Sequence, residues 1–84
     1  MTILGQITLH GRQFRIVDNR RCKRDRLCLD TLEDGSWTRV CRYPDMSDIL
    51  FWLYLYEKGG VRIEDCKEYR KVLKDRCKNL EKKI

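Results

Sequence analysis

Five cysteines and a single histidine are the side chains of this 84-residue chain that could carry metal or nucleophilic chemistry. No two cysteines have C-x-x-C spacing, so a zinc site would need ligands scattered over most of the sequence. An odd number of cysteines, without an amino-terminal secretory signal, argues against a disulfide framework. Buried cysteine behaves as a small hydrophobic side chain. We therefore expect no metal site and five free thiols, at Cys22, Cys28, Cys41, Cys66 and Cys77.

Catalysis has few candidates in this inventory. Histidine-based acid–base chemistry would have to use His10, which precedes Gly11 at an expected turn. The sequence contains no G-x-S-x-G, Walker-type or H-E-x-x-H motif. Cys22 lies among Arg20, Arg21, Lys23 and Arg24, a cationic setting of the kind that lowers a thiol pKa, but a bystander in a loop is the simpler interpretation. The sequence predicts a protein that is not an enzyme and needs no cofactor.

Positive charge is concentrated in residues 19–26, where five Lys or Arg residues accompany one Asp. The whole chain has a formal net charge of +6. Such a segment attracts acidic protein surfaces or the phosphates of nucleic acid. A solvated loop is the alternative, because charge alone does not choose a partner. The candidate partner-binding residues in this basic loop are Arg20, Arg21, Lys23, Arg24 and Arg26.

An apolar helix over residues 45–58 is the element around which the chain is organised. Residues 49–56 are apolar or aromatic without interruption, far short of the roughly 20 residues that cross a bilayer. Asp45 and Asp48 suit the first turn, and Gly59-Gly60 suits the end. Helical spacing divides these residues between two roughly opposite faces. One face comprises Met46, Ile49, Leu50, Leu53 and Tyr56, and the other comprises Phe51, Trp52 and Leu55. A helix that is apolar all round is either covered all round or displays a surface to a partner.

Two β-hairpins are expected before this helix. Alternating apolar residues predict strands over 3–10 and 13–18, and again over 26–33 and 36–43. Two-residue turns at His10-Gly11 and Asp34-Gly35 would pair Ile7 with Phe14, Gly5 with Ile16, Leu29 with Val40, Asp30 with Arg39, Cys28 with Cys41 and Leu32 with Trp37. The core face of the second hairpin would then hold Leu27, Leu29 and Val40. A slip of one residue would exchange the two faces.

A second helix should follow a short extended segment at 61–63. Asp65 and Glu68 fit a capping box at its start. Its apolar stripe is narrow, and the first helix is the nearest partner for it; the stripe comprises Cys66, Tyr69, Leu73, Cys77, Leu80 and Ile84. The sequence therefore predicts a single α+β domain over residues 1–84, a four-stranded antiparallel sheet made of two β-hairpins and followed by two α-helices, in the order ββββαα.

Two classes of binding surface follow from these elements. The polar sheet face would carry Trp37 and Tyr43 beside Arg15, Arg26 and Arg39, and such a basic aromatic surface can stack the bases of nucleic acid. The alternative is that Trp37 packs locally against Leu32, the residue opposite it on the neighbouring strand. The first helix carries more aromatic surface than a small domain readily buries, which favours a protein partner unless the sheet and second helix cover it. The candidate partner-binding residues outside the basic loop are Trp37, Arg39, Tyr43 and Trp52.

The pattern resembles a loosely defined group of small phage and prophage proteins. The matching segments are RQFRIVD, LCLDTLEDGSWTRVCRYPD, DILFWLYLY and VRIEDCKEYRKVL. The resemblance implies a phage or mobile-element protein in the cytoplasm of the host bacterium that inhibits a host factor, as anti-CRISPR inhibitors do, by stoichiometric protein binding. The alternative is a nucleic-acid-binding module that uses the basic loop and the basic, aromatic sheet face. The expected partner is a host protein or nucleoprotein complex and not a membrane, and a dimer is compatible with the sequence.

Overall fold

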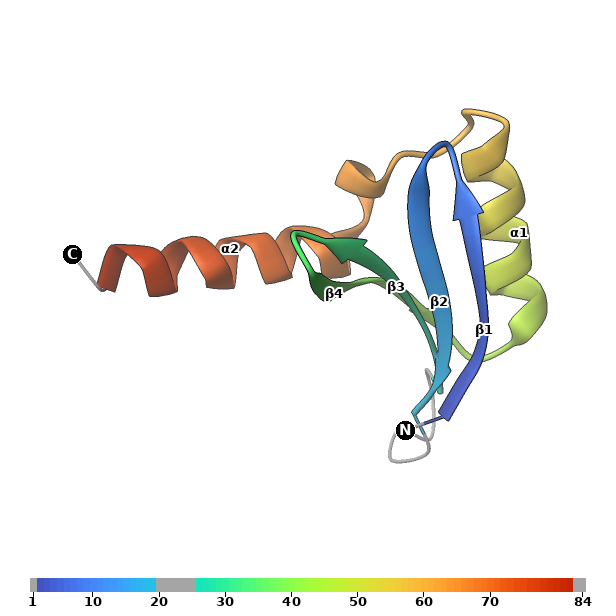
Figure 1. Cartoon of the computed structure of the whole chain (residues 1–84), viewed down its shortest axis with the longest axis horizontal. Coiled ribbons are helices and arrows are strands. Elements are labelled where there is room, and N and C mark those ends of the chain that lie inside the picture. Colours follow the sequence, from blue (N-terminus) through green and yellow to red (C-terminus); the bar gives the residue numbers. More distant parts are fainter. Residues whose placement is uncertain (1, 20–25, 83–84) are drawn as a thin grey trace.

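The four strands form one antiparallel sheet in the order β1-β2-β3-β4, followed by two helices (Figure 1). The computed structural model describes residues 2–19 and 26–82, and within them side chains up to residue 75. The elements are β1 (Thr2–Leu9), β2 (Arg12–Asp18), β3 (Leu27–Glu33), β4 (Ser36–Tyr43), α1 (Met46–Glu57), a short 3-10 helix η1 (Ile63–Asp65) and α2 (Lys67–Lys82). The predicted ββββαα arrangement of an α+β fold is confirmed.

Both hairpins are closed by two residues in the left-handed region. The φ angles are 52° at His10 and 75° at Gly11, and 49° at Asp34 and 79° at Gly35. Positive φ at both central residues matches the right-handed twist of the paired strands, which explains the preference for Asp-Gly in such turns. The expected pairs of Ile7 with Phe14, Gly5 with Ile16, Asp30 with Arg39 and Leu32 with Trp37 are all present.

A β-bulge in the second hairpin changes the pairing beyond these positions. The register shifts between Leu29 and Asp30, so Leu29 pairs with Cys41 and Val40 is the extra residue of β4. The predicted pairs of Leu29 with Val40 and Cys28 with Cys41 are therefore wrong, and Cys28 pairs with Arg42. As a consequence Cys41 joins the core and Tyr43 packs against it, although both were expected on the opposite face.

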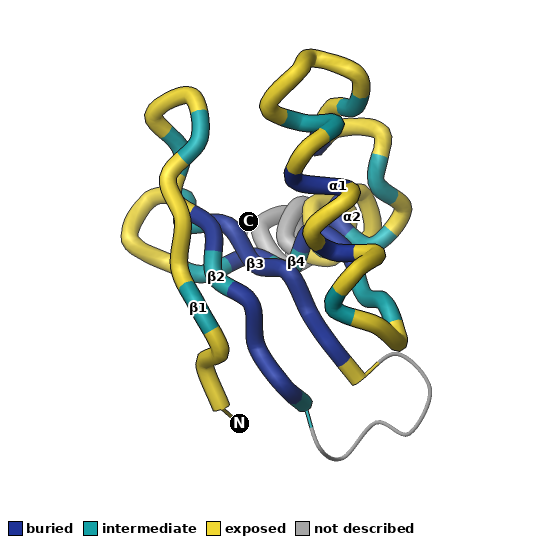
Figure 2. Tube along the Cα trace, turned by 90° about the vertical axis from the view of Figure 1, so that its right-hand side faces the viewer, coloured by how far each residue is buried: buried dark blue, intermediate teal, exposed yellow. Residues whose placement is uncertain are grey.

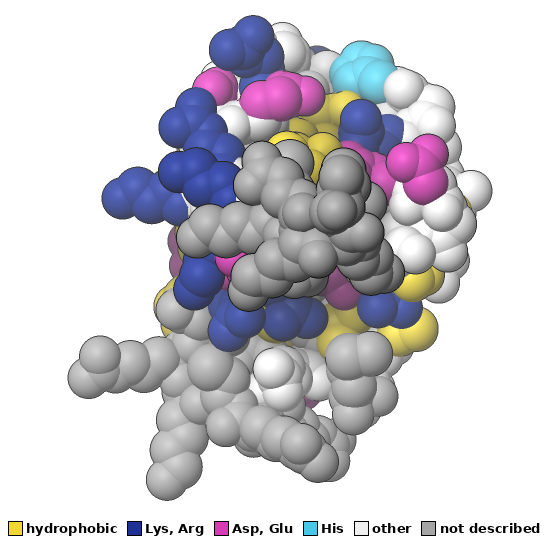
Figure 3. All heavy atoms as spheres, turned by 90° about the vertical axis from the view of Figure 1, so that its left-hand side faces the viewer, with side chains coloured by type: hydrophobic (Ala, Val, Ile, Leu, Met, Phe, Trp, Pro, Cys, Tyr) yellow, Lys and Arg dark blue, Asp and Glu magenta, His cyan; other side chains and the backbone are white. Residues whose placement is uncertain are grey.

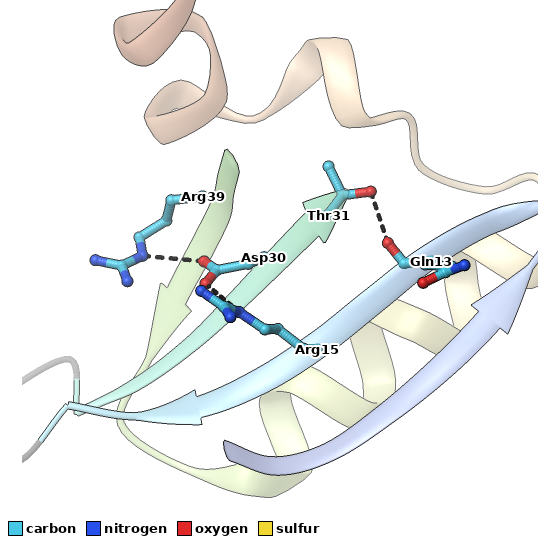
Figure 4. Close-up of polar contacts among 5 residues, drawn as sticks. All are labelled: Gln13, Arg15, Asp30, Thr31 and Arg39. Atoms are coloured by element: carbon cyan, nitrogen blue, oxygen red, sulfur yellow. Dashed lines mark hydrogen bonds and ion pairs between the residues drawn. The ribbon is translucent and has the colours of Figure 1, made fainter. Parts of the chain in front are cut away.

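The core lies between one face of the sheet and α1. Strand residues Phe14, Leu29 and Val40 are fully buried there, together with Ile49 of the helix. Thr31 is also fully buried, and its hydroxyl donates a 3.0 Å hydrogen bond to the Gln13 carbonyl oxygen (Figure 4). Burying a hydroxyl costs little once it is hydrogen-bonded, which allows a threonine in this position.

Helix α1 begins after Asp45 and ends before a left-handed Gly59, as expected, but it is turned on its axis relative to the predicted faces. The Asp45 side chain makes no capping hydrogen bond. Trp52 is buried with Ile49 and Leu53, whereas Leu50 is exposed. A helix that is apolar on all sides has no polar stripe to fix this rotation, so spacing alone assigned the wrong neighbours to the core.

Helix α2 does not cover α1. Its first turns pack against β4 and η1, and the rest projects away from the sheet on the side opposite α1 (Figure 1). Asp65 lies within η1 and Cys66 precedes the helix, so the predicted capping box is not at the helix start. Tyr69 is buried and Leu73 is exposed. Within the described ranges, no helix has the length and apolar character needed to cross a membrane.

Candidate functional site

The sheet face opposite α1 carries a compact charged cluster formed by Arg15, Asp30 and Arg39 (Figure 4). The Nε atoms of Arg15 and Arg39 lie 3.1 and 3.2 Å from the two carboxylate oxygens of Asp30. Asp30 is almost fully buried, and both arginines are largely covered. A buried carboxylate is tolerated only when it is paired, and here each oxygen has its own guanidinium. Both guanidinium groups of the cluster are therefore engaged by the Asp30 carboxylate of the same chain.

Trp37 lies on the same face, and the Arg15 side chain lies over its ring. The guanidinium carbon of Arg15 lies 4.6 Å from the Trp37 ring centroid, a cation–π contact. Tyr43 packs against the core on the other face, so it does not extend this surface. Arg26 donates hydrogen bonds of 2.8 and 3.0 Å to the Asp18 carboxylate at the strand ends. Of the expected basic aromatic surface, the structure brings together Arg15, Trp37 and Arg39 alone.

The rest of this side is mixed in charge. Figure 3 shows Lys and Arg side chains gathered along one side of it, with Asp and Glu side chains among them. The exposed cations that precede η1 or belong to α2 are Arg62, Lys67, Arg70, Lys71 and Lys74. The loop candidates Arg20, Arg21, Lys23 and Arg24 lie outside the described residues.

Trp52, the candidate of the central helix, lies in the core and not on a surface. Its ring stacks on Tyr56 with centroids 5.4 Å apart and planes 10° from parallel. Phe14 meets both rings edge-on, at 6.1 Å from Trp52 and 5.2 Å from Tyr56. These contacts fix α1 to β2 and make Trp52 a structural residue.

The outward side of α1 is apolar and uncovered. Leu50, Phe51 and Tyr54 are 53%, 61% and 55% exposed, and we call these three residues the α1 outer face. Tyr54 is four residues after Leu50 and three after Phe51, and side chains at these spacings are neighbours on a helix, so Tyr54 joins the other two into one patch. In Figure 2 the exposed residues follow the outward side of α1. The charged residues of the helix and its caps are mostly acidic: Asp45, Asp48 and Glu57, with Lys58 placed 5.8 Å from the Tyr54 ring centroid.

An open hollow of about 530 Å³ lies between the two hairpin turns and is lined mainly by polar residues. Two of its charged side chains are paired with each other, because Arg12 Nη1 lies 2.8 Å from Glu33 Oε1. The hydroxyl of Tyr69 donates a hydrogen bond to the same Glu33 oxygen. The Arg12–Glu33–Tyr69 cluster links β2, β3 and α2, which makes it a structural contact between the sheet and the second helix.

The cysteines of the described residues do not assemble into a reactive centre. Cys41 is buried and Cys66 half-buried, and both carry free thiols. Burial raises the pKa of each thiol, so the nucleophilic thiolate is disfavoured. No group of three or more His, Cys, Asp or Glu side chains in the described part of the chain is arranged to hold a metal ion. Cys22 lies outside the described residues, and the Cys77 side chain is not described.

A comparison with protein-family models finds no match, and comparisons with curated proteins and with solved structures find none either. The candidate surface is therefore defined by the geometry of this chain alone. Sequence reasoning recognised the excess of aromatic residues in the helix but selected Trp52 for the surface. The signal that distinguishes Trp52 from Phe51 is packing against β2, which helical spacing does not contain.

Proposed function

We propose that the protein binds a protein partner stoichiometrically through the α1 outer face. The observation that carries this proposal is the exposure of Leu50, Phe51 and Tyr54 on a helix whose other side forms the core. Adjacent large apolar side chains on a small domain mark interaction sites, and aromatic residues are enriched among binding hot spots. The sequence resemblance to phage and prophage proteins adds the biological setting, an inhibitor of a host bacterial factor.

The chemistry of the helix also restricts the partner. Exposed Asp45 and Asp48 lie at the start of α1 and exposed Glu57 lies at its end, although the chain as a whole is basic. Complementary charge at an interface suppresses wrong partners and fixes register. The partner surface is accordingly an apolar depression with cationic side chains at its rim.

Nucleic-acid binding through the sheet has less support. Arg15 and Arg39 are engaged by Asp30, and Arg15 also covers the Trp37 ring. Base stacking needs an uncovered aromatic face, and phosphate binding needs cations that are not already paired. The described part of the sheet face meets neither condition well.

The test compares a double variant of the outer face, Phe51→Ser with Tyr54→Ser, with a control variant, Leu73→Ser, on α2. All three side chains are exposed, so both variants should keep the fold. Affinity capture from host lysate, with and without nuclease, supplies a partner that is then purified and titrated. We expect one-to-one binding, a loss of affinity of about 30-fold or more in the double variant, and no loss in the control.

Two results would contradict the proposal. One is a partner that disappears after nuclease treatment, which would identify nucleic acid as the ligand. The other is a reconstituted target that is fully inhibited by far less than one equivalent of the protein, because that result requires turnover.

A further inference from the structure

Strand β1 forms a free edge of the sheet. It is first in the strand order and pairs with β2 alone among the described strands. Ile3, Leu4 and Ile7 are 48%, 46% and 43% exposed, and the remaining residues of the strand are exposed or half-buried (Figure 2). At the other edge, the start of α2 lies against β4, with Arg42 Nε 4.0 Å from Glu68 Oε2.

This edge lacks most features that prevent strands from pairing. Natural edge strands are usually protected by charged side chains, by proline or by bulges. The segment from Thr2 to Leu9 contains no charged residue and no proline, in a chain where 38% of residues are charged. The irregularity between Ile3 and Gly5 is its one protective feature, and the strand beyond it pairs regularly to Leu9.

Charge does not oppose a second copy of the chain as the occupant of the edge. Two molecules with a net charge of +6 repel one another wherever their cationic surfaces meet. At β1 this penalty is small, because the strand is uncharged and the neighbouring cations of β2 are engaged in ion pairs. Arg12 is paired with Glu33 and Arg15 with Asp30.

Shape supports the same occupant. Ile7 lies opposite Phe14 and therefore on the face that carries α1, but it stays 43% exposed because α1 lies beside β3 and β4 (Figure 2). A β1 strand from another molecule would bring a second Ile7 towards this uncovered part of the face.

We propose that β1 pairs antiparallel with β1 of a second copy, forming a two-fold dimer with a continuous eight-stranded sheet. A two-fold contact uses the same strand from both molecules and leaves no free β1 edge. Because α2 lies against β4, growth from the opposite edge is hindered and the assembly closes at two. The α1 outer face does not take part, so this inference goes beyond the proposed partner binding.

The test measures molecular mass in solution by sedimentation equilibrium, for the parent and two variants. Thr8→Lys places a charge on the edge strand. Gln13→Lys places the same charge directly opposite Thr8 on β2, where the side chain is also exposed but not at the edge. We expect the parent and Gln13→Lys to have twice the 10.2 kDa chain mass. Thr8→Lys should weaken dimerisation about tenfold or more while its melting temperature at low protein concentration stays unchanged.

Hydrogen exchange of the outward-pointing β1 amides provides a second measurement. It reports on pairing at the edge, because these amides have no partner among the described strands of the folded monomer. Alternate amides of β1 point away from β2, and in the dimer they should exchange slowly in the parent and quickly in Thr8→Lys. A parent protein that stays monomeric up to about 1 mM would overturn the proposal, because even a Kd of about 1 mM populates the dimer there. A dimer that Thr8→Lys leaves intact, or a monomer whose edge binds an unrelated extended peptide, would overturn it as well.

Discussion

At the scale of single residues, Leu50 and Leu53 of α1 are chemically identical and differ in environment. Leu53 is 5% exposed and packs in the core, whereas Leu50 is 53% exposed on the α1 outer face. Truncating a buried leucine removes its transfer free energy and leaves a cavity. The pair therefore measures directly which side of the helix stabilises the fold.

We predict that Leu53→Ala lowers the free energy of unfolding by about 2 to 5 kcal/mol. For a domain of this size that is a large share of a total of about 4 to 13 kcal/mol. Leu50→Ala, the matched control, should change it by less than about 0.5 kcal/mol. Urea unfolding followed by tryptophan fluorescence measures both variants. Equal losses in the two variants would mean that the outer face is covered in the isolated protein.

Side-chain placement shows where sequence reasoning reached its limit. The Asp34-Gly35 turn was predictable because its left-handed conformation selects those residue types. The bulge at Val40 carries no such local mark, and it transferred Cys41 and Tyr43 to the core side. A single extra residue reverses the side chains beyond it. The predicted core face was therefore right for Leu27, Leu29 and Val40 and wrong for Cys41 and Tyr43.

At the scale of elements, α2 is held to the sheet by its first turns. Tyr69 is buried in the core cluster, and its hydroxyl donates to Glu33, which also accepts from Arg12. Burial raises the pKa of Tyr69, and the hydrogen bond to the Glu33 carboxylate and its negative charge raise it further. The folded state therefore favours the protonated phenol.

The sign of the pH dependence follows from this shift. A group whose pKa is raised by folding contributes stability below its unfolded pKa, about 10 for tyrosine, and loses that contribution as pH rises through the folded value. We predict that Tyr69→Phe is less stable than the parent by about 1 to 2 kcal/mol at neutral pH, because one hydrogen bond to a carboxylate is lost. The difference should shrink at pH values above about 10.

Urea unfolding of both proteins across this pH range measures the effect. Tyr54→Phe is the control, since Tyr54 is exposed on α1. A Tyr69→Phe deficit that stays constant at alkaline pH would contradict the prediction, because it would mean that folding does not raise the pKa of Tyr69.

The position of α2 could not be predicted from its sequence. Its narrow stripe correctly indicated an amphipathic helix, but the stripe does not say which surface the helix meets. The surface on which α2 packs is set by Tyr69 and its hydrogen bond to Glu33, a contact between residues 36 positions apart. The existence and order of the elements followed from local patterns, whereas their docking depended on contacts between distant residues.

At the scale of the whole molecule, charge and apolar surface are separated. The α1 outer face has acidic neighbours, β1 is uncharged, and the net charge of +6 resides elsewhere. The exposed part of α2 and the basic loop at residues 20–26 carry much of it. In the proposed complex, net charge of this kind would steer the molecule towards a partner that is acidic as a whole, while the carboxylates of α1 would act at the contact itself.

The basic loop provides the last prediction. Changing Arg20, Arg21, Lys23 and Arg24 together to Ser lowers the net charge from +6 to +2, because four positive charges are removed. The fold should remain, since a connecting loop contributes little to the core. We expect the protein partner to associate more slowly with this variant while dissociation changes little, because dispersed surface charges mainly steer the encounter.

Bare DNA or RNA separates this mechanism from direct nucleic-acid binding. The parent protein should bind either polymer weakly, because a cluster of five cations without base-reading side chains gives affinity without specificity. Fluorescence anisotropy between about 50 and 200 mM salt measures this, since phosphate contacts make binding fall steeply over that range. Tight, salt-sensitive binding by the parent that the loop variant loses would instead assign the loop to nucleic acid. The α1 outer face would then need another role, because its exposed leucine, phenylalanine and tyrosine have no part in phosphate recognition.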